Sequence, residues 1–156
     1  MKKLITLLLI LSALIAPCLI MAAGTATQTY APVYSNEGVT NLSTLTFTWT
    51  SDATGDVTST TSTTISNQIA GKYVVMAATS PDTTAPTASY DITVTDANNV
   101  DIMGGVLANR SATSTEQATP YIGALYGNRP VAGALKLNVS NAGDAKSGTV
   151  ILYLSR

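Results

Sequence analysis

The chain has 156 residues, of which 46% are hydrophobic and only 11% are charged, and its formal net charge is −1. It contains no histidine and a single cysteine, which excludes hydrolases with a serine–histidine pair and argues against zinc sites built from cysteine and histidine. This length fits one domain and a short N-terminal segment. The lack of a Lys/Arg cluster argues against nucleic acid as a partner.

The N-terminal segment has the organisation of a secretory signal peptide. Lysines at positions 2 and 3 are followed by the almost wholly apolar run 4–21 and then by the small residues Ala22, Ala23 and Gly24. A basic start, an apolar stretch and a small-residue site are typical of a signal peptide. We therefore predict that residues 1–23 are cleaved off and that the protein is exported to the extracellular space, the cell surface or a virion.

Two other interpretations of this segment stay open. The apolar run is about as long as the roughly 20 residues that a membrane-spanning helix needs, so residues 1–23 can instead be a retained membrane anchor. The run Ile15-Ala16-Pro17-Cys18 is similar to a bacterial lipobox, which would place a lipid on Cys18. Contact with a membrane is expected only through residues 1–23, if they stay uncleaved.

The remaining chain, residues 24–156, has neither cysteine nor histidine, and its six basic and nine acidic side chains give a net charge of −3. Because no disulfide can form, stability must come from a hydrophobic core, for which the length is sufficient.

Strict alternation predicts the first strand, Thr44–Thr50. Leu45, Phe47 and Trp49 fall on one face, which we expect to be the core face, and the intervening threonines fall on the other. The Ser/Thr-rich tract 57–66 is an edge strand or a loop, with the edge strand favoured because threonine suits strands. Residues 72–79 predict a further strand.

A hairpin is predicted next. Tyr90, Ile92 and Val94 alternate with polar residues, the turn sequence 96–99 follows, and the alternation resumes over 100–102. Residues 106–126 show no clear pattern, and Pro120 and Pro130 argue against a long helix in this part of the chain.

The last two strands are expected to form another hairpin. Leu135, Leu137 and Val139 alternate with polar residues, the loop 141–148 follows, and the final strand is Thr149–Leu154. Both faces of that strand are apolar, because Ile151 and Tyr153 lie opposite Val150, Leu152 and Leu154. Such a strand either lies in the centre of the fold or is covered by a neighbouring subunit, which makes Ile151 and Tyr153 a candidate subunit contact.

About seven short strands with Gly, Pro, Asn and Asp turns predict an all-β fold. We expect a single antiparallel β-sandwich domain over residues 24–156, immunoglobulin-like or jelly-roll-like.

The sequence gives little indication of a catalytic or metal site. The nine acidic residues fall mostly in turns, where carboxylates cap backbone amides, so we expect no enzyme and no cofactor. Asp91, Asp96 and Asp101 surround one hairpin and leave calcium as an alternative, although they lack the dense spacing of a calcium loop. The threonine row 44–50 has the regularity of ice- or carbohydrate-binding faces, but it is also the ordinary outward face of a strand.

Four pieces of the chain, in order and spacing, carry a resemblance to a known family: Thr48–Ala53, Tyr90–Asp96, the stretch from Val100-Asp101 through Gly104-Gly105 and Ala108-Asn109-Arg110 to Thr115-Glu116-Gln117, and Leu137–Gly143 with Lys146–Val150. On these pieces the chain resembles, from about residue 45 to residue 154, a family of small, mostly uncharacterised β-domain proteins of tailed bacteriophages and prophages. It implies a virion-associated or accessory structural role and no activity or binding residues. The signal peptide departs from that pattern, because virion proteins of tailed phages assemble in the cytoplasm.

Two functions follow as hypotheses. In the first, the protein is a non-enzymatic structural or decoration subunit that binds copies of itself or a viral or surface assembly. In the second, it is an exported monomeric binding module, adhesin-like, that contacts glycan or a cell surface.

Overall fold

The computed structural model describes residues 22–35 and 38–156, so the predicted signal peptide lies almost wholly outside the described residues. The chain is 50% strand and 5% helix, and its sheets are antiparallel, which confirms the predicted all-β fold. Within the described ranges, no helix is long and apolar enough to cross a membrane.

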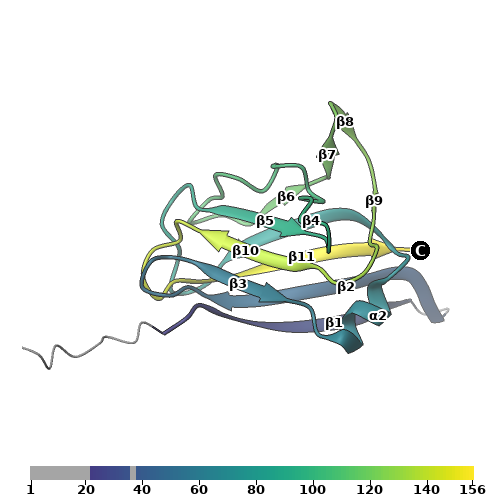
Figure 1. Cartoon of the computed structure of the whole chain (residues 1–156), viewed down its shortest axis with the longest axis horizontal. Helices are drawn as coiled ribbons and strands as arrows, with labels where there is room; N and C mark the ends of the chain where they lie inside the picture. The colour runs from purple at the N-terminus through teal and green to yellow at the C-terminus, as the bar shows by residue number, and fades with distance from the viewer. Residues whose placement is uncertain (1–21, 36–37) are drawn as a thin grey trace, which may run out of the picture.

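The larger sheet has the strand order β1-β2-β11-β4-β6, and β9 also pairs with β4. Its strands are β1 (Thr25–Ser35), β2 (Gly38–Thr50), β4 (Tyr73–Pro81), β6 (Glu116–Ala118), β9 (Arg129–Pro130) and β11 (Ser147–Ser155). Strand β11 therefore lies between β2 and β4 at the centre of the sheet (Figure 1). Strand β1 lies at the edge, where Pro32 is tolerated because an edge strand has one row of amides without ladder partners.

The smaller sheet has the order β3-β10-β5. Its strands are β3 (Val57–Thr60), β5 (Asp91–Thr95) and β10 (Lys136–Ser140), and a separate hairpin is formed by β7 (Tyr121–Ile122) and β8 (Leu125–Tyr126). In Figure 1 this hairpin projects beyond the rest of the molecule. The described residues form eleven strands, more than the roughly seven expected from the sequence, and four of them (β6, β7, β8 and β9) have only two or three residues.

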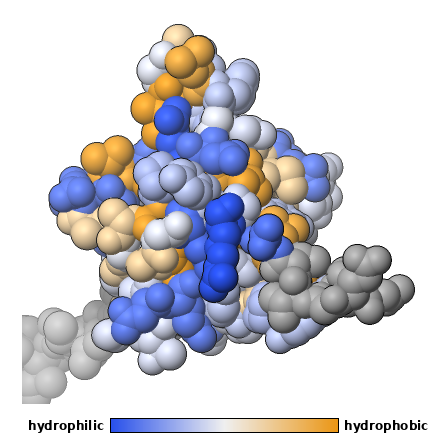
Figure 2. All heavy atoms as spheres, turned by 90° about the vertical axis from the view of Figure 1, so that its right-hand side faces the viewer, coloured by the Kyte–Doolittle hydropathy of each residue, from blue (hydrophilic) through white to orange (hydrophobic). Residues whose placement is uncertain are grey.

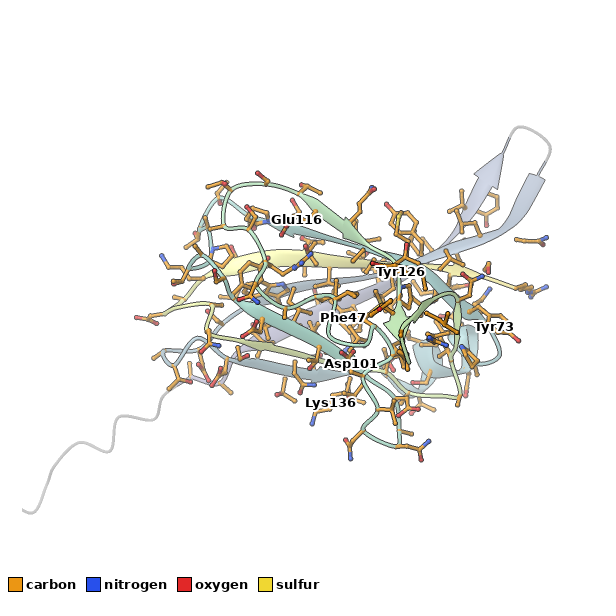
Figure 3. All side chains as sticks on the ribbon, turned by 90° about the horizontal axis from the view of Figure 1, so that it is seen from above. Phe47, Tyr73, Asp101, Glu116, Tyr126 and Lys136 are labelled. Atoms are coloured by element: carbon orange, nitrogen blue, oxygen red, sulfur yellow. The ribbon has the colours of Figure 1, made fainter. Side chains whose placement is uncertain are left out.

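One hydrophobic core is shared by the two sheets. Leu45, Phe47 and Trp49 on β2 are at most 1% exposed, as predicted, and they belong to one cluster with the buried side chains of the smaller sheet. The other predicted core residues are also buried: Tyr90, Ile92, Val94, Leu135, Leu137 and Val139. In Figure 3, Phe47 lies in the interior and Lys136 at the outside. The immunoglobulin-like or jelly-roll-like arrangement stays a prediction.

The predicted hairpin between residues 135–140 and 149–154 is wrong. Strand β10 pairs with β3 and β5 in the smaller sheet, whereas β11 pairs with β2 and β4 in the larger one. The loop between them crosses from one sheet to the other and is anchored there, because Ala142 is fully buried and its N–H donates to the Gly55 carbonyl at 3.0 Å. Two strands that follow each other in the sequence need not pair, because one can bury its apolar face from one sheet and the other from the second sheet.

The tract 57–66 is a strand only over its first four residues. From Thr63 to Ile69 the chain forms a helix, α2. Ser62 caps its N-terminus, because the Ser62 hydroxyl accepts a hydrogen bond from the Ile65 N–H. Ile65 and Ile69 are four residues apart, so a helix places both on one face, and Ile69 is fully buried. The expected strand at 100–102 is reduced to a single bridge between Thr95 and Asp101.

Candidate interaction surface

Ile151 and Tyr153, the predicted subunit contact, lie on the outer face of the larger sheet. The alternate residues of β11, Val150, Leu152 and Leu154, are fully buried in the core. Ile151 and Tyr153 are half-buried, so part of each side chain is open to solvent. Because β11 is the central strand, both side chains lie near the middle of this face.

The register of the strands gives these two residues threonine neighbours on β2 and apolar neighbours on β4. Ile151 is opposite Thr46 on β2 and Ala78 on β4. Tyr153 is opposite Thr44 on β2 and Met76 on β4. The two side chains therefore form an apolar centre with threonine on the side of β2.

We call this surface the outer face. The register and the alternation of the strands place on it Thr25, Thr27, Thr29, Ala31, Leu42, Thr44, Thr46, Thr48, Thr50, Tyr73, Met76, Ala78, Ser80, Gln117, Ser147, Thr149, Ile151, Tyr153 and Ser155. None of these described residues is charged. The predicted threonine row on β2 is thus part of a wider threonine field, which extends onto β1 and β11.

Two threonine hydroxyls of this field bond to the sheet itself. Thr44 Oγ1 donates to the Ala31 carbonyl and Thr27 Oγ1 donates to the Thr48 carbonyl, both at 3.5 Å. These bonds turn the hydroxyls toward the backbone, so that methyl groups of the threonines contribute to the surface. The outer face is therefore neutral and only mildly polar.

A second exposed surface is the β7–β8 hairpin. Leu125 and Tyr126 are 70% and 73% exposed, and the rings of Tyr121 and Tyr126 lie 4.6 Å apart between centroids. Arg129 steadies the hairpin, because its Nη2 donates to the Ile122 carbonyl at 3.1 Å. Figure 2 shows hydrophobic side chains gathered at the tip of this projection.

Sequence reasoning missed this hairpin because of its turn. Gly123 and Ala124 both have positive φ, at 65° and 66°, as a two-residue type I′ turn requires. Alanine is an unusual residue at such a position, which Asn, Asp or Gly normally occupies. The remaining signal was the repeat of an aromatic and an aliphatic residue on each side of the turn, Tyr-Ile and Leu-Tyr.

The three aspartates weighed as calcium ligands each cap a different piece of backbone. Asp91 Oδ1 accepts from the Asn109 N–H, Asp96 Oδ1 from those of Asn98 and Val100, and Asp101 Oδ1 and Oδ2 from those of Met103 and Gly105. Within residues 22–35 and 38–156, no three His, Cys, Asp or Glu side chains are grouped to hold a metal ion. The carboxylates therefore act on loop structure, which is the ordinary role of aspartate in turns.

No protein-family model matches the chain, and the search of curated proteins gives no match. The function of the outer face and of the β7–β8 hairpin must therefore be inferred from their own chemistry.

Proposed function

We propose that this chain is a non-enzymatic structural protein that assembles with copies of itself through the outer face. The observation that carries the proposal is the position of Ile151 and Tyr153. Two large apolar side chains, partly open to solvent, lie at the centre of a broad face whose described residues carry no charge. Covering such a centre removes apolar surface from water, which contributes roughly 25 cal/mol per Å².

A second copy of the chain is the partner that this face fits best. A two-fold contact brings the same patch of both subunits together, so the patch has to be complementary to its own copy. A charged patch would repel its own copy, whereas a neutral field of threonine around an apolar centre is compatible with itself. The exposed tip of the β7–β8 hairpin offers a further apolar contact in an assembly.

The setting that we propose is extracellular or virion-associated. It rests on the signal-peptide organisation of residues 1–23 and on the resemblance to phage β-domain proteins. These two sequence features concern where the protein is found and not which residues form its contacts.

The test is the mass of the particle in solution. We expect the wild-type protein to be larger than one subunit in analytical ultracentrifugation and negative-stain images. Ile151→Asp and Tyr153→Asp should each give a folded monomer, because a charge without a partner is costly to bury at an interface. Thr58→Asp is the matched control, since Thr58 is exposed on the smaller sheet.

The variants also separate the outer face from the core. Val150 and Leu152 are fully buried, so an aspartate at either position should unfold the subunit instead of only dissociating it. Normal assembly of Ile151→Asp and Tyr153→Asp would show that the outer face is not the contact. A strictly monomeric wild type at high concentration would favour the monomeric binding module instead.

A further inference from the structure

A pocket of about 290 Å³ opens where the ends of β1, β2 and β11 meet the residue that precedes β4. It lies at the end of the molecule that carries the C-terminus in Figure 1, which is turned toward the viewer in Figure 2. The lining includes the two cations Lys72 and Arg156, the ring residues Tyr30 and Pro32, and the polar Ser43. None of the described residues that line it has an acidic side chain.

Lys72 is the unusual member of this lining. Lys72 is only 8% exposed, whereas lysine is almost never this buried without a partner. In the part of the chain that the structure describes, the one ion pair joins Arg110 and Glu116, and no carboxylate pairs with Lys72. The ammonium group instead lies 5.8 Å from the centre of the Tyr30 ring, within range of a cation–π contact.

The backbone holds Lys72 in this position from both sides. Its N–H donates to the Ile69 carbonyl at the end of α2, at 3.0 Å, and its carbonyl accepts from the Val131 N–H at 2.8 Å. The residue is thus fixed between the helix and the segment that precedes β10. Because the backbone of Lys72 is already ordered, binding an anion costs less ordering at this position.

We propose that this pocket binds a small organic monocarboxylate with a ring or aliphatic body, such as an acidic monosaccharide. Of the two cations that line the pocket, Lys72 is buried and Arg156 is exposed, so a single negative charge is enough to neutralise the buried one. The planar guanidinium of Arg156 matches a carboxylate with two parallel hydrogen bonds. Tyr30 and Pro32 provide flat apolar surface for the body of the ligand.

The volume of the pocket limits the size of the ligand. Sites for drug-sized molecules occupy about 300–1,000 Å³, and this pocket is slightly smaller than that range, so a ligand of monosaccharide size fits it best. The inference does not depend on self-assembly, since Lys72 and Tyr30 are not part of the outer face.

The experiment is calorimetric and NMR titration of the full-length protein with sodium glucuronate. Glucose serves as the neutral counterpart and inorganic phosphate as the alternative anion. We expect saturable binding of glucuronate, no binding of glucose, and weaker binding of phosphate. Lys72→Met should weaken glucuronate binding by about 10- to 100-fold, because a hydrogen bond to a charged group is lost.

Two controls keep the result interpretable. Lys136→Met removes a lysine from the smaller sheet, outside the pocket, and should leave the affinity unchanged. Lys72→Arg keeps the charge and should retain most of the binding, and the melting temperature of each variant confirms that it folds. The proposal is overturned if glucuronate does not bind, if Lys72→Met binds it as tightly as the wild type, or if phosphate binds equally well, since that would be general attraction of anions.

Discussion

The ring centroids of Trp49 and Tyr90 lie 5.7 Å apart with the planes tilted by 51°. Trp49 belongs to β2 of the larger sheet, and Tyr90 immediately precedes β5 of the smaller sheet, so their contact joins the two sheets. Both residues are about 1% exposed, and tilted aromatic pairs at this distance contribute about 0.5–1.5 kcal/mol beyond the burial of their area.

Phe47→Ala should strongly destabilise the protein. Phe47 is fully buried in the shared core, and truncation of a buried phenylalanine costs about 3–5 kcal/mol. Thermal unfolding followed by circular dichroism measures the effect. Thr48→Ala is the control from the exposed side of the same strand and should cost about 1 kcal/mol or less. Equal melting temperatures of the two variants would contradict the assignment of the core face.

Gly148→Ala should destabilise the centre of the larger sheet. A Cβ at this position would lie 2.7 Å from Trp49 Cζ2 and 3.0 Å from the Ser80 carbonyl oxygen, so either the indole or the strand has to move. We expect a loss of about 1–3 kcal/mol, as for other overpacked cores. Gly133→Ala is the matched control, because a Cβ there meets nothing within 4 Å. Chemical denaturation of both variants compares them, and equal midpoints would show that Trp49 yields without cost.

Tyr90 should make the stability fall at high pH. Burial raises the pKa of Tyr90 to about 12 from 10.0, and the negative charge of Glu116 adds to the shift. Because the Tyr90 phenol loses its proton at a lower pH in the unfolded state than in the folded state, high pH stabilises the unfolded state relative to the folded one. The contribution is therefore fully present below pH 10 and is lost as the pH rises from about 10 to 12, by roughly 2 kcal/mol.

The comparison that isolates this effect uses Tyr90→Phe, which keeps the contact with Trp49 and removes the phenol. Melting temperatures at about pH 9 and about pH 11.5 should differ less in Tyr90→Phe than in the wild type. All other ionisable groups are the same in the two proteins, so their contributions cancel. An identical pH dependence of the two proteins would show that Tyr90 ionises without resistance.

Ser51→Ala should loosen the crossing between the two sheets. The Ser51 hydroxyl donates to the Gly143 carbonyl at 2.6 Å and accepts from the Lys146 N–H at 2.9 Å, and Ser51 is 5% exposed. Removing it leaves both backbone groups without this partner, which costs about 1–3 kcal/mol. Hydrogen exchange at the Lys146 amide should speed up. Ser114→Ala, at an exposed site, should change neither the stability nor the exchange rate of the Lys146 amide. An unchanged exchange rate in Ser51→Ala would show that another group accepts the hydrogen bond of that amide.

The core could be predicted from the sequence because alternation is a local signal. Leu45, Phe47 and Trp49 share a face whatever strand they pair with, and the same holds for Ile92 and Val94. Burial of those faces follows from the hydrophobic effect and does not require the strand order. The same reasoning placed Ile151 and Tyr153 opposite the buried side of β11.

Strand pairing and polar strands could not be predicted in this way. Strand β1 turns Ala26, Gln28 and Tyr30 toward the inside, and Gln28 is used there to donate to Ser59 Oγ at 2.8 Å, so the strand lacks an apolar pattern. The separation of β10 from β11 depends on the anchoring of Ala142 and Ser51, which are far apart in the sequence. The pocket around Lys72 likewise combines ends of strands that only the tertiary structure brings together.

The central place of β11 has a consequence for the order of events during synthesis. The larger sheet cannot close until residues 147–155 are available, because β2 and β4 are joined only through β11. A ribosome-bound chain that lacks them leaves the backbone amides and carbonyls on one edge of β2 without their β11 partners. Pairing between positions as distant as Leu45 and Leu152 also slows folding. The larger sheet therefore forms late, after the residues of its central strand have been added to the chain.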